Sequence, residues 1–121
     1  MRTLLVLTVL VLVPFLGCEY AQSAKTRETP KPSAEKGQRI FEDDCSICHY
    51  ADRADDKLGP GMKGLFKNKL LPTSHKPATE ENVREQISKG DPQGKPMPMP
   101  AFGDQLNAAQ MDDLVEYLKT L

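Results

Sequence analysis

Cys45-Ser46-Ile47-Cys48-His49 is the stretch of this chain that most constrains its fold. Two cysteines three positions apart, followed directly by a histidine, form the pattern at which haem is attached covalently to proteins. The two thiols would form thioether bonds to one edge of the porphyrin. The next residue would then lie under the ring, where an imidazole can bond the iron. We therefore expect one haem c, attached at Cys45 and Cys48, with His49 as an iron ligand.

Other uses of this motif fit the rest of the sequence less well. A thioredoxin-like redox pair requires strands around the two cysteines, and no segment shows the alternating pattern of a strand. A zinc site requires further ligands, and only His75 remains as a second histidine. A plain disulfide between Cys45 and Cys48 leaves His49 unexplained. Covalent haem is thus the favoured interpretation.

The composition agrees with a small domain built around a bound group. The chain has 121 residues, no tryptophan and seven other aromatic residues, which provide little bulky material for a core. A buried prosthetic group would supply the missing apolar volume. The formal charge is −1, from 16 basic and 17 acidic side chains. This balance argues against nucleic acid as a partner, since nucleic-acid binding requires a clear basic excess.

The N-terminal part is typical of an exported protein. Residues 1–17 combine Arg2 with an apolar run from residue 4 to residue 16, a length that suits a signal peptide and is too short to span a bilayer. We therefore expect a periplasmic or otherwise exported protein. Cys18 follows Gly17 directly and resembles the lipidated cysteine of a bacterial lipobox, which would anchor the protein to a membrane. Cleavage after Ser23, or an unmodified Cys18, are the alternatives.

Residues 18–33 are polar, contain two prolines and show no apolar period, so they are expected to form a flexible tether. The folded domain is expected at 34–121 and to be all-α. Ser33 is the predicted cap of a first helix that runs from residue 34 into the cysteine motif.

Two more helices are indicated by their caps. Thr79 precedes a helix at 80–89 that ends at Gly90, and Asn107 begins a last helix with Gln110 in the capping-box position. Between the first two helices, residues 50–78 lack any period, apart from a short helix expected at Met62–Lys69. A loop this long is reasonable in a compact domain if it wraps around a bound group.

The folded part resembles the class I cytochrome c family over residues 34–121. Gly37 and Phe41 resemble the Gly-x-x-x-aromatic pair of the family's first helix, and Leu114 and Tyr117 stand where their partners on the last helix would be. The resemblance implies the cytochrome c fold, with three main helices and long loops wrapped around one haem.

Two further segments extend this resemblance. Leu58-Gly59-Pro60, with Gly64, is similar to the family's Gly-Pro-x-Leu-x-Gly stretch, which implies that the carbonyl of Pro60 orients the axial histidine. Met99-Pro100-Ala101-Phe102 is similar to the segment that contains the sixth ligand of the iron, which implies Met99 in that role. Met97-Pro98 is a near duplicate. Residues two apart in an extended chain point the same way, so Met97 stays an alternative, as do His75 or an open site.

An iron with two strong axial ligands has no vacant position for a substrate. We therefore expect a one-electron carrier and not an enzyme. The carrier would meet redox proteins transiently, in the periplasm or at the membrane. A haem subunit of a larger oxidoreductase is the alternative, and a five-coordinate gas sensor or peroxidase is a third candidate. Five lysines of the predicted haem-wrapping loop form either a basic docking ring or an ordinary solvated surface: Lys57, Lys63, Lys67, Lys69 and Lys76.

Overall fold

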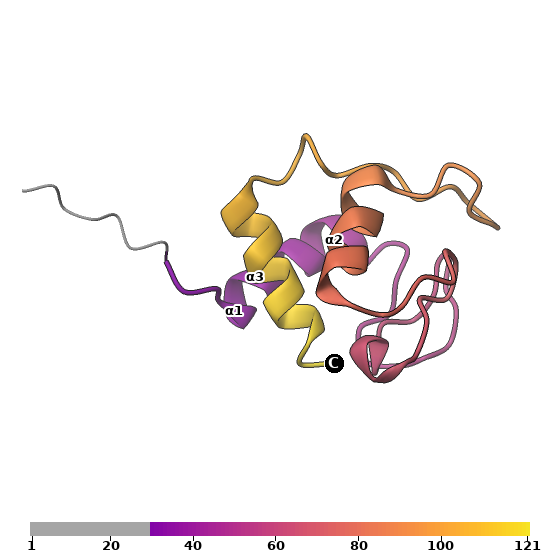
Figure 1. Ribbon diagram of the computed structural model, residues 1–121, viewed down its shortest axis with the longest axis horizontal. Coiled ribbons are helices and arrows are strands. Elements are labelled where there is room, and N and C mark those ends of the chain that lie inside the picture. Colours follow the sequence, from indigo (N-terminus) through magenta and orange to yellow (C-terminus); the bar gives the residue numbers. More distant parts are fainter. Residues whose placement is uncertain (1–29) are drawn as a thin grey trace, which may run out of the picture.

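The computed structural model describes residues 30–121. The expected signal peptide at 1–17, Cys18 and most of the expected tether lie outside these residues. The part of the chain that the structure describes contains three α-helices and no strand, which confirms the predicted all-α class (Figure 1). None of these helices is both long enough and apolar enough to cross a membrane.

The first helix, α1 (Ala34–Ile40), begins where the sequence predicts. The side chain of Ser33 accepts a hydrogen bond from the backbone N–H of Lys36. The helix does not continue unchanged into the cysteine motif. It widens into a π-helical segment, Phe41–Cys45, in which the N–H of Ser46 donates to the carbonyl of Phe41 over 2.8 Å. Such widened turns are frequent at functional sites.

The other two helices also follow their predicted caps. In α2 (Glu80–Lys89) the side chain of Thr79 accepts from the N–H of Asn82, and Gly90 ends the helix with a positive φ of 67°. In α3 (Ala108–Leu118) both hydrogen bonds of the capping box are present, from Asn107 and from Gln110, each at 3.0 Å. The prediction of a helix at Met62–Lys69 was too long, because only a 3₁₀ turn, Leu65–Lys67, forms there.

Helices α1 and α3 pack closely against each other (Figure 1). Gly37 is buried at their contact, where an added Cβ atom would lie 2.5 Å from the carbonyl carbon of Asp113 and 2.8 Å from Cβ of Tyr117. One turn further on, the rings of Phe41 and Tyr117 meet with centroids 5.6 Å apart. The N–H of Ser33 donates to the carboxylate of Asp113 over 2.6 Å. The small residue at position 37 therefore permits the approach that the sequence indicated.

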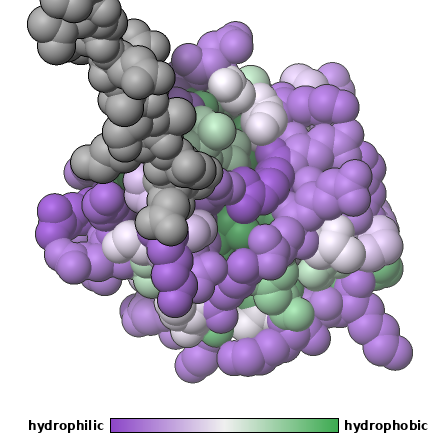
Figure 2. Space-filling model, turned by 60° about the vertical axis from the view of Figure 1, so that its left-hand side comes forward, coloured by the Kyte–Doolittle hydropathy of each residue, from purple (hydrophilic) through white to green (hydrophobic). Residues whose placement is uncertain are grey.

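Helix α2 is tied to α3 by ion pairs on the surface. The guanidinium of Arg84 lies 2.6 Å from the carboxylate of Asp112, and the ammonium of Lys119 lies 2.6 Å from that of Glu80. The buried apolar side chains come from the π-helical segment after α1, from α2 and α3, and from the loops: Phe41, Leu65, Leu71, Val83, Ile87, Phe102, Met111, Leu114, Val115 and Leu118. The face of the molecule that Figure 2 shows is mostly hydrophilic, with apolar residues showing in restricted areas.

Candidate cofactor site

A large cavity lies between the cysteine motif, α2, α3 and the long loops. Its volume is about 1160 Å³, including space open to solvent. Sites for small molecules and cofactors are typically concave and mostly apolar. The cavity is lined by residues from the cysteine motif, the loops at 58–62 and 71–73, α2, the segment 91–102 and α3. Cys45, Cys48, His49, Pro60 and both methionines are among its lining residues.

The π-helical segment and the turn after it set the position of the two thiols. The backbone N–H groups of Cys48 and His49 both donate to the carbonyl of Cys45, over 3.0 Å and 2.9 Å. Cys45 and Cys48 are only partly exposed and form no disulfide with each other. Burial raises the pKa of the Cys45 thiol to about 12, with smaller contributions from the charge of Asp44 and from Cys48.

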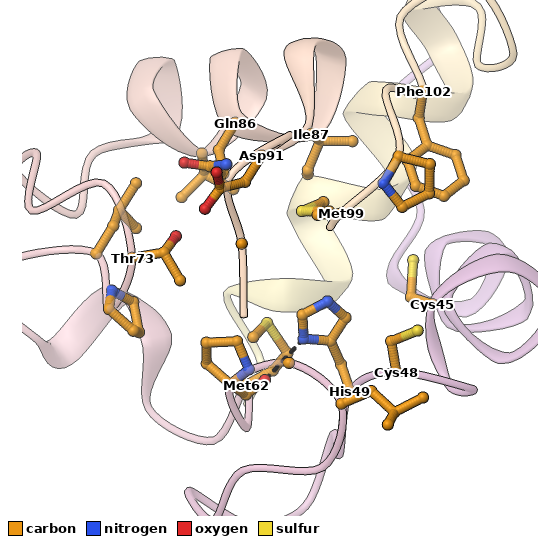
Figure 3. A pocket seen from close by; sticks show the side chains of 18 of the residues that line it. Cys45, Cys48, His49, Met62, Thr73, Gln86, Ile87, Asp91, Met99 and Phe102 are labelled. Carbon is orange, nitrogen blue, oxygen red and sulfur yellow. Dashed lines mark hydrogen bonds between the residues drawn. The ribbon is translucent and has the colours of Figure 1, made fainter. Parts of the chain in front are cut away.

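His49 is held by the loop that contains Gly59 and Pro60. Its Nδ1 atom lies 2.7 Å from the carbonyl oxygen of Pro60 (Figure 3). A carbonyl oxygen can only accept, so Nδ1 carries the proton and Nε2 keeps a lone pair for a metal. The backbone of Gly59 approaches the imidazole closely, since a Cβ atom there would lie 2.5 Å from Cε1 of His49. The Gly-Pro pair thus sets both the orientation and the tautomer of the ring.

The two methionines differ in how they are held. Met99 is partly buried, packs against the core and exchanges two backbone hydrogen bonds with Asp91, over 2.9 Å and 3.0 Å. In Figure 3 its sulfur lies above the cavity, while His49 rises from below. Met97 also lines the cavity, but 52% of its surface is exposed. The geometry therefore favours Met99 for a position opposite His49.

The remaining candidates lie away from the cavity or have other contacts. His75 is not among the lining residues and adopts a left-handed backbone conformation with φ 54°. Among the five lysines, Lys57 donates to the carbonyl of Ser46, Lys67 to that of Leu121, and Lys76 forms an ion pair with Glu85. Three lysines of the expected docking ring thus have partners of their own.

Several polar residues of the cavity were not predicted. Thr73, Gln86 and Asp91 line it together with the apolar side chains (Figure 3). Asp91 is the most informative, because its backbone pairing with Met99 sets the register of the methionine segment. The signal for this pairing was weak in the sequence: Asp91 follows the helix-ending Gly90 directly, where a turn was expected but no partner could be named.

The cavity suits a haem in its chemistry. A porphyrin is a large apolar ring, and most lining side chains are apolar. Two thiols, an imidazole with a free Nε2 and a thioether sulfur lie around the same space. These are the groups from which c-type haem attachment and axial ligation are built.

Comparison with known proteins gives consistent results. The family model for cytochrome c matches residues 34–121. A cytochrome c-553-like protein of Synechocystis sp. is 31% identical over 91 residues, which cover 75% of this chain and 71% of that protein. A cytochrome c of Gossypium barbadense is 39% identical over 44 residues, which cover 36% of this chain and 40% of that protein.

A solved structure, cytochrome c6 from the diatom Phaeodactylum tricornutum, superimposes with a TM-score of 0.51 at 25% identity. The match covers 73% of this chain and 92% of the diatom protein.

Proposed function

This chain belongs to the cytochrome c family and carries one covalently bound haem c as a one-electron carrier, and we propose which of its residues do this work. Cys45 and Cys48 would hold the haem through thioether bonds, and His49 and Met99 would bind its iron. The observation that carries the proposal is the convergence of these four side chains on one apolar cavity, with Nδ1 of His49 engaged by Pro60.

The haem supplies the redox chemistry, a change of one electron at the iron. The chain's own residues hold the iron ligands and limit access of water. Pro60 keeps His49 in the tautomer that leaves Nε2 free, and this hydrogen bond makes the imidazole a better ligand. Phe102, Leu114 and Leu118 contribute buried apolar surface to the cavity wall and disfavour water there.

We further propose that the protein has no enzymatic activity of its own, because two axial ligands leave no vacant position on the iron. Its partners are redox proteins that it contacts transiently. Such complexes of electron carriers are typically short-lived and bury a small interface.

The experiment is to produce the full chain in a host that matures c-type cytochromes and to denature it in acid acetone. Pigment that stays with the polypeptide supports thioether attachment, and pigment that washes away contradicts it. Cys45→Ala and Cys48→Ala should each weaken attachment, and the double variant should abolish it.

The same preparation tests the ligands. We expect a ferrous spectrum that carbon monoxide does not change and a sulfur-to-iron charge-transfer band in the ferric state. Rapid binding of carbon monoxide would instead indicate a five-coordinate iron, as in a gas sensor or peroxidase. Stable co-purification with a catalytic protein would indicate a subunit of a larger oxidoreductase.

The placement of the protein in the cell is a separate proposal, carried by the sequence of its N-terminal part. Residues 1–17 act as a signal peptide, Cys18 is lipidated, and residues 18–33 tether the domain of residues 34–121 to a membrane face in the periplasm. Fractionation of a bacterial producing strain tests this. The native chain should be found with membranes and Cys18→Ser in the soluble periplasmic fraction, whereas equal distribution of the two would contradict lipidation.

A further inference from the structure

The segment that contains Met99 also contains a second sulfur without an assigned role. Met97 lines the same cavity although half of its surface is exposed. An exposed large apolar side chain is common on surfaces and needs no explanation by itself. Met97 lies in a bend two residues before Met99, and both side chains line the one cavity.

The sequence around both methionines repeats with a period of two residues. It reads Lys95-Pro96-Met97-Pro98-Met99-Pro100. Proline has no backbone N–H, so Met97 and Met99 are the residues of 96–100 that can donate to a neighbouring segment. In the structure the N–H of Met99 donates to the carbonyl of Asp91, and the N–H of Asp91 donates to the carbonyl of Met99.

A shift of the segment by two residues would bring Met97 into the place of Met99, a movement of about 7 Å along an extended chain. The pattern of prolines and N–H groups would be unchanged, so Met97 could make the same two hydrogen bonds to Asp91. A strand slips between registers most easily where its pattern does not distinguish them. Here the Met-Pro repeat offers the same two backbone hydrogen bonds and a methionine sulfur in the native register and in the register shifted by two residues.

The flanking residues permit this shift and also explain why one register is preferred. Residues 95–98 are exposed, so the loop before Met99 can shorten without loss of core packing. Ala101 is exposed too and can take up the added length before Phe102, whose N–H is fixed to the carbonyl of Ile87 at 3.0 Å.

We propose that Met97 is a reserve sulfur ligand, which takes the position of Met99 when the pairing of Asp91 with Met99 is lost. This inference rests on the proposed role of Met99 as the resident ligand. Its consequence is that the iron keeps a thioether ligand, and the protein remains an electron carrier, after Met99 leaves the cavity.

The test compares four full-length proteins loaded with haem: the native chain, Met97→Ala, Met99→Ala and the double variant. The readouts are the sulfur-to-iron charge-transfer band of the ferric protein and binding of carbon monoxide by the ferrous protein. We expect Met97→Ala to match the native chain, Met99→Ala to keep a weakened band, and the double variant to lose the band and bind carbon monoxide.

Each other result contradicts the inference in a recognisable way. If Met99→Ala behaves like the double variant, Met97 does not replace Met99, while the proposed function stands. If Met97→Ala alone loses the band, Met97 is the resident ligand and the assignment of Met99 is wrong. If the native chain itself lacks the band, the proposed axial ligation fails before any variant is compared.

Discussion

Nδ1 of His49 and the carbonyl oxygen of Pro60 are 2.7 Å apart, although eleven residues of chain separate them. Two backbone hydrogen bonds stabilise this contact: the N–H groups of Leu58 and Gly59 both donate to the carbonyl of Cys48, over 3.2 Å and 2.8 Å. The loop is thereby fixed to the residue that precedes the histidine. The orientation of the imidazole is a property of this closed loop and does not depend on the histidine alone.

Gly59→Ala should displace the imidazole, since the added Cβ atom would lie 2.5 Å from Cε1 of His49. The hydrogen bond to Pro60 would be lost or lengthened. Loss of such outer contacts to a metal ligand typically weakens binding or function about 10- to 100-fold. We expect a lower yield of low-spin haem protein and an altered reduction potential, measured by spectroscopy and potentiometric titration.

The control for this variant is Gly103→Ala, which adds a Cβ atom 3.0 Å from the carbonyl oxygen of Ser88, on a segment that does not contact His49. Its haem spectrum should match that of the native chain. A Gly59→Ala protein with an unchanged spectrum and potential would show that His49 does not need the close approach of this backbone.

Gly37→Ala should separate α1 from α3. The added methyl group would lie 2.5 Å from backbone of Asp113 and 2.8 Å from Cβ of Tyr117, neither of which can turn away as a flexible side chain would. Overpacking of this kind typically destabilises a fold by about 1–3 kcal/mol. Denaturant unfolding of the haem-loaded protein measures the loss. Gln38→Ala, on the exposed side of the same helix, should change stability by less than about 0.5 kcal/mol.

Asn107→Ala should weaken the start of α3. It removes the side chain that accepts from the N–H of Gln110 at 3.0 Å. Loss of an N-cap typically costs about 1 kcal/mol of stability. Thermal unfolding followed by circular dichroism should show the decrease, and Asn107→Asp should restore most of the native value. Equal stability of the native and Ala variants would contradict a role for the capping box.

Glu85 should make stability depend on acid pH. Hydrogen bonds from Lys76 and then Lys89, with their charges, lower the pKa of this carboxyl from 4.5 to about 2 in the folded state. Its contribution is therefore complete above the pKa of the unfolded state and is lost as pH falls from 4.5 toward 2. The difference in melting temperature between the native chain and Glu85→Gln should narrow over this range and also shrink in high salt.

Glu81→Gln is the matched control, because Glu81 lies on the same helix and forms no ion pair within the described residues. The difference in melting temperature between Glu81→Gln and the native chain should vary less with pH. If the difference in melting temperature between Glu85→Gln and the native chain does not depend on pH, Lys76 and Lys89 do not lower the pKa of this carboxyl in solution.

The sequence predicted those parts of the fold that depend on nearby residues. The side chains of Ser33, Thr79 and Asn107 each accept a hydrogen bond from the backbone N–H three residues later, so the starts of these helices could be predicted from the sequence. The site was visible for a similar reason, since Cys45, Cys48 and His49 are almost contiguous. Pro60 and Met99 required the family resemblance, because their relation to His49 exists only after the loops have closed.

Features that depend on distant contacts could not be predicted in this way. The widening of the helix after Ile40 adds one residue to a turn, which leaves the apolar pattern nearly unchanged. The turn at Leu65–Lys67 is short because Gly64 precedes it in a left-handed conformation and Asn68 follows it in an extended one. The choice between Met97 and Met99 depends on Asp91, and nothing in a two-residue repeat indicates which member pairs with it.

The bond between Ser33 and Asp113 joins positions 80 residues apart. Closing a loop of that length opposes folding by an entropy that later contacts must offset, and such remote pairing generally slows the folding rate. A nascent chain that has reached only residue 107 lacks all of α3 and leaves the buried face of α1 exposed to water. Among the described helices, the one that is synthesised first is consequently among the last to be secured, and it runs directly into the segment that ends at Cys45.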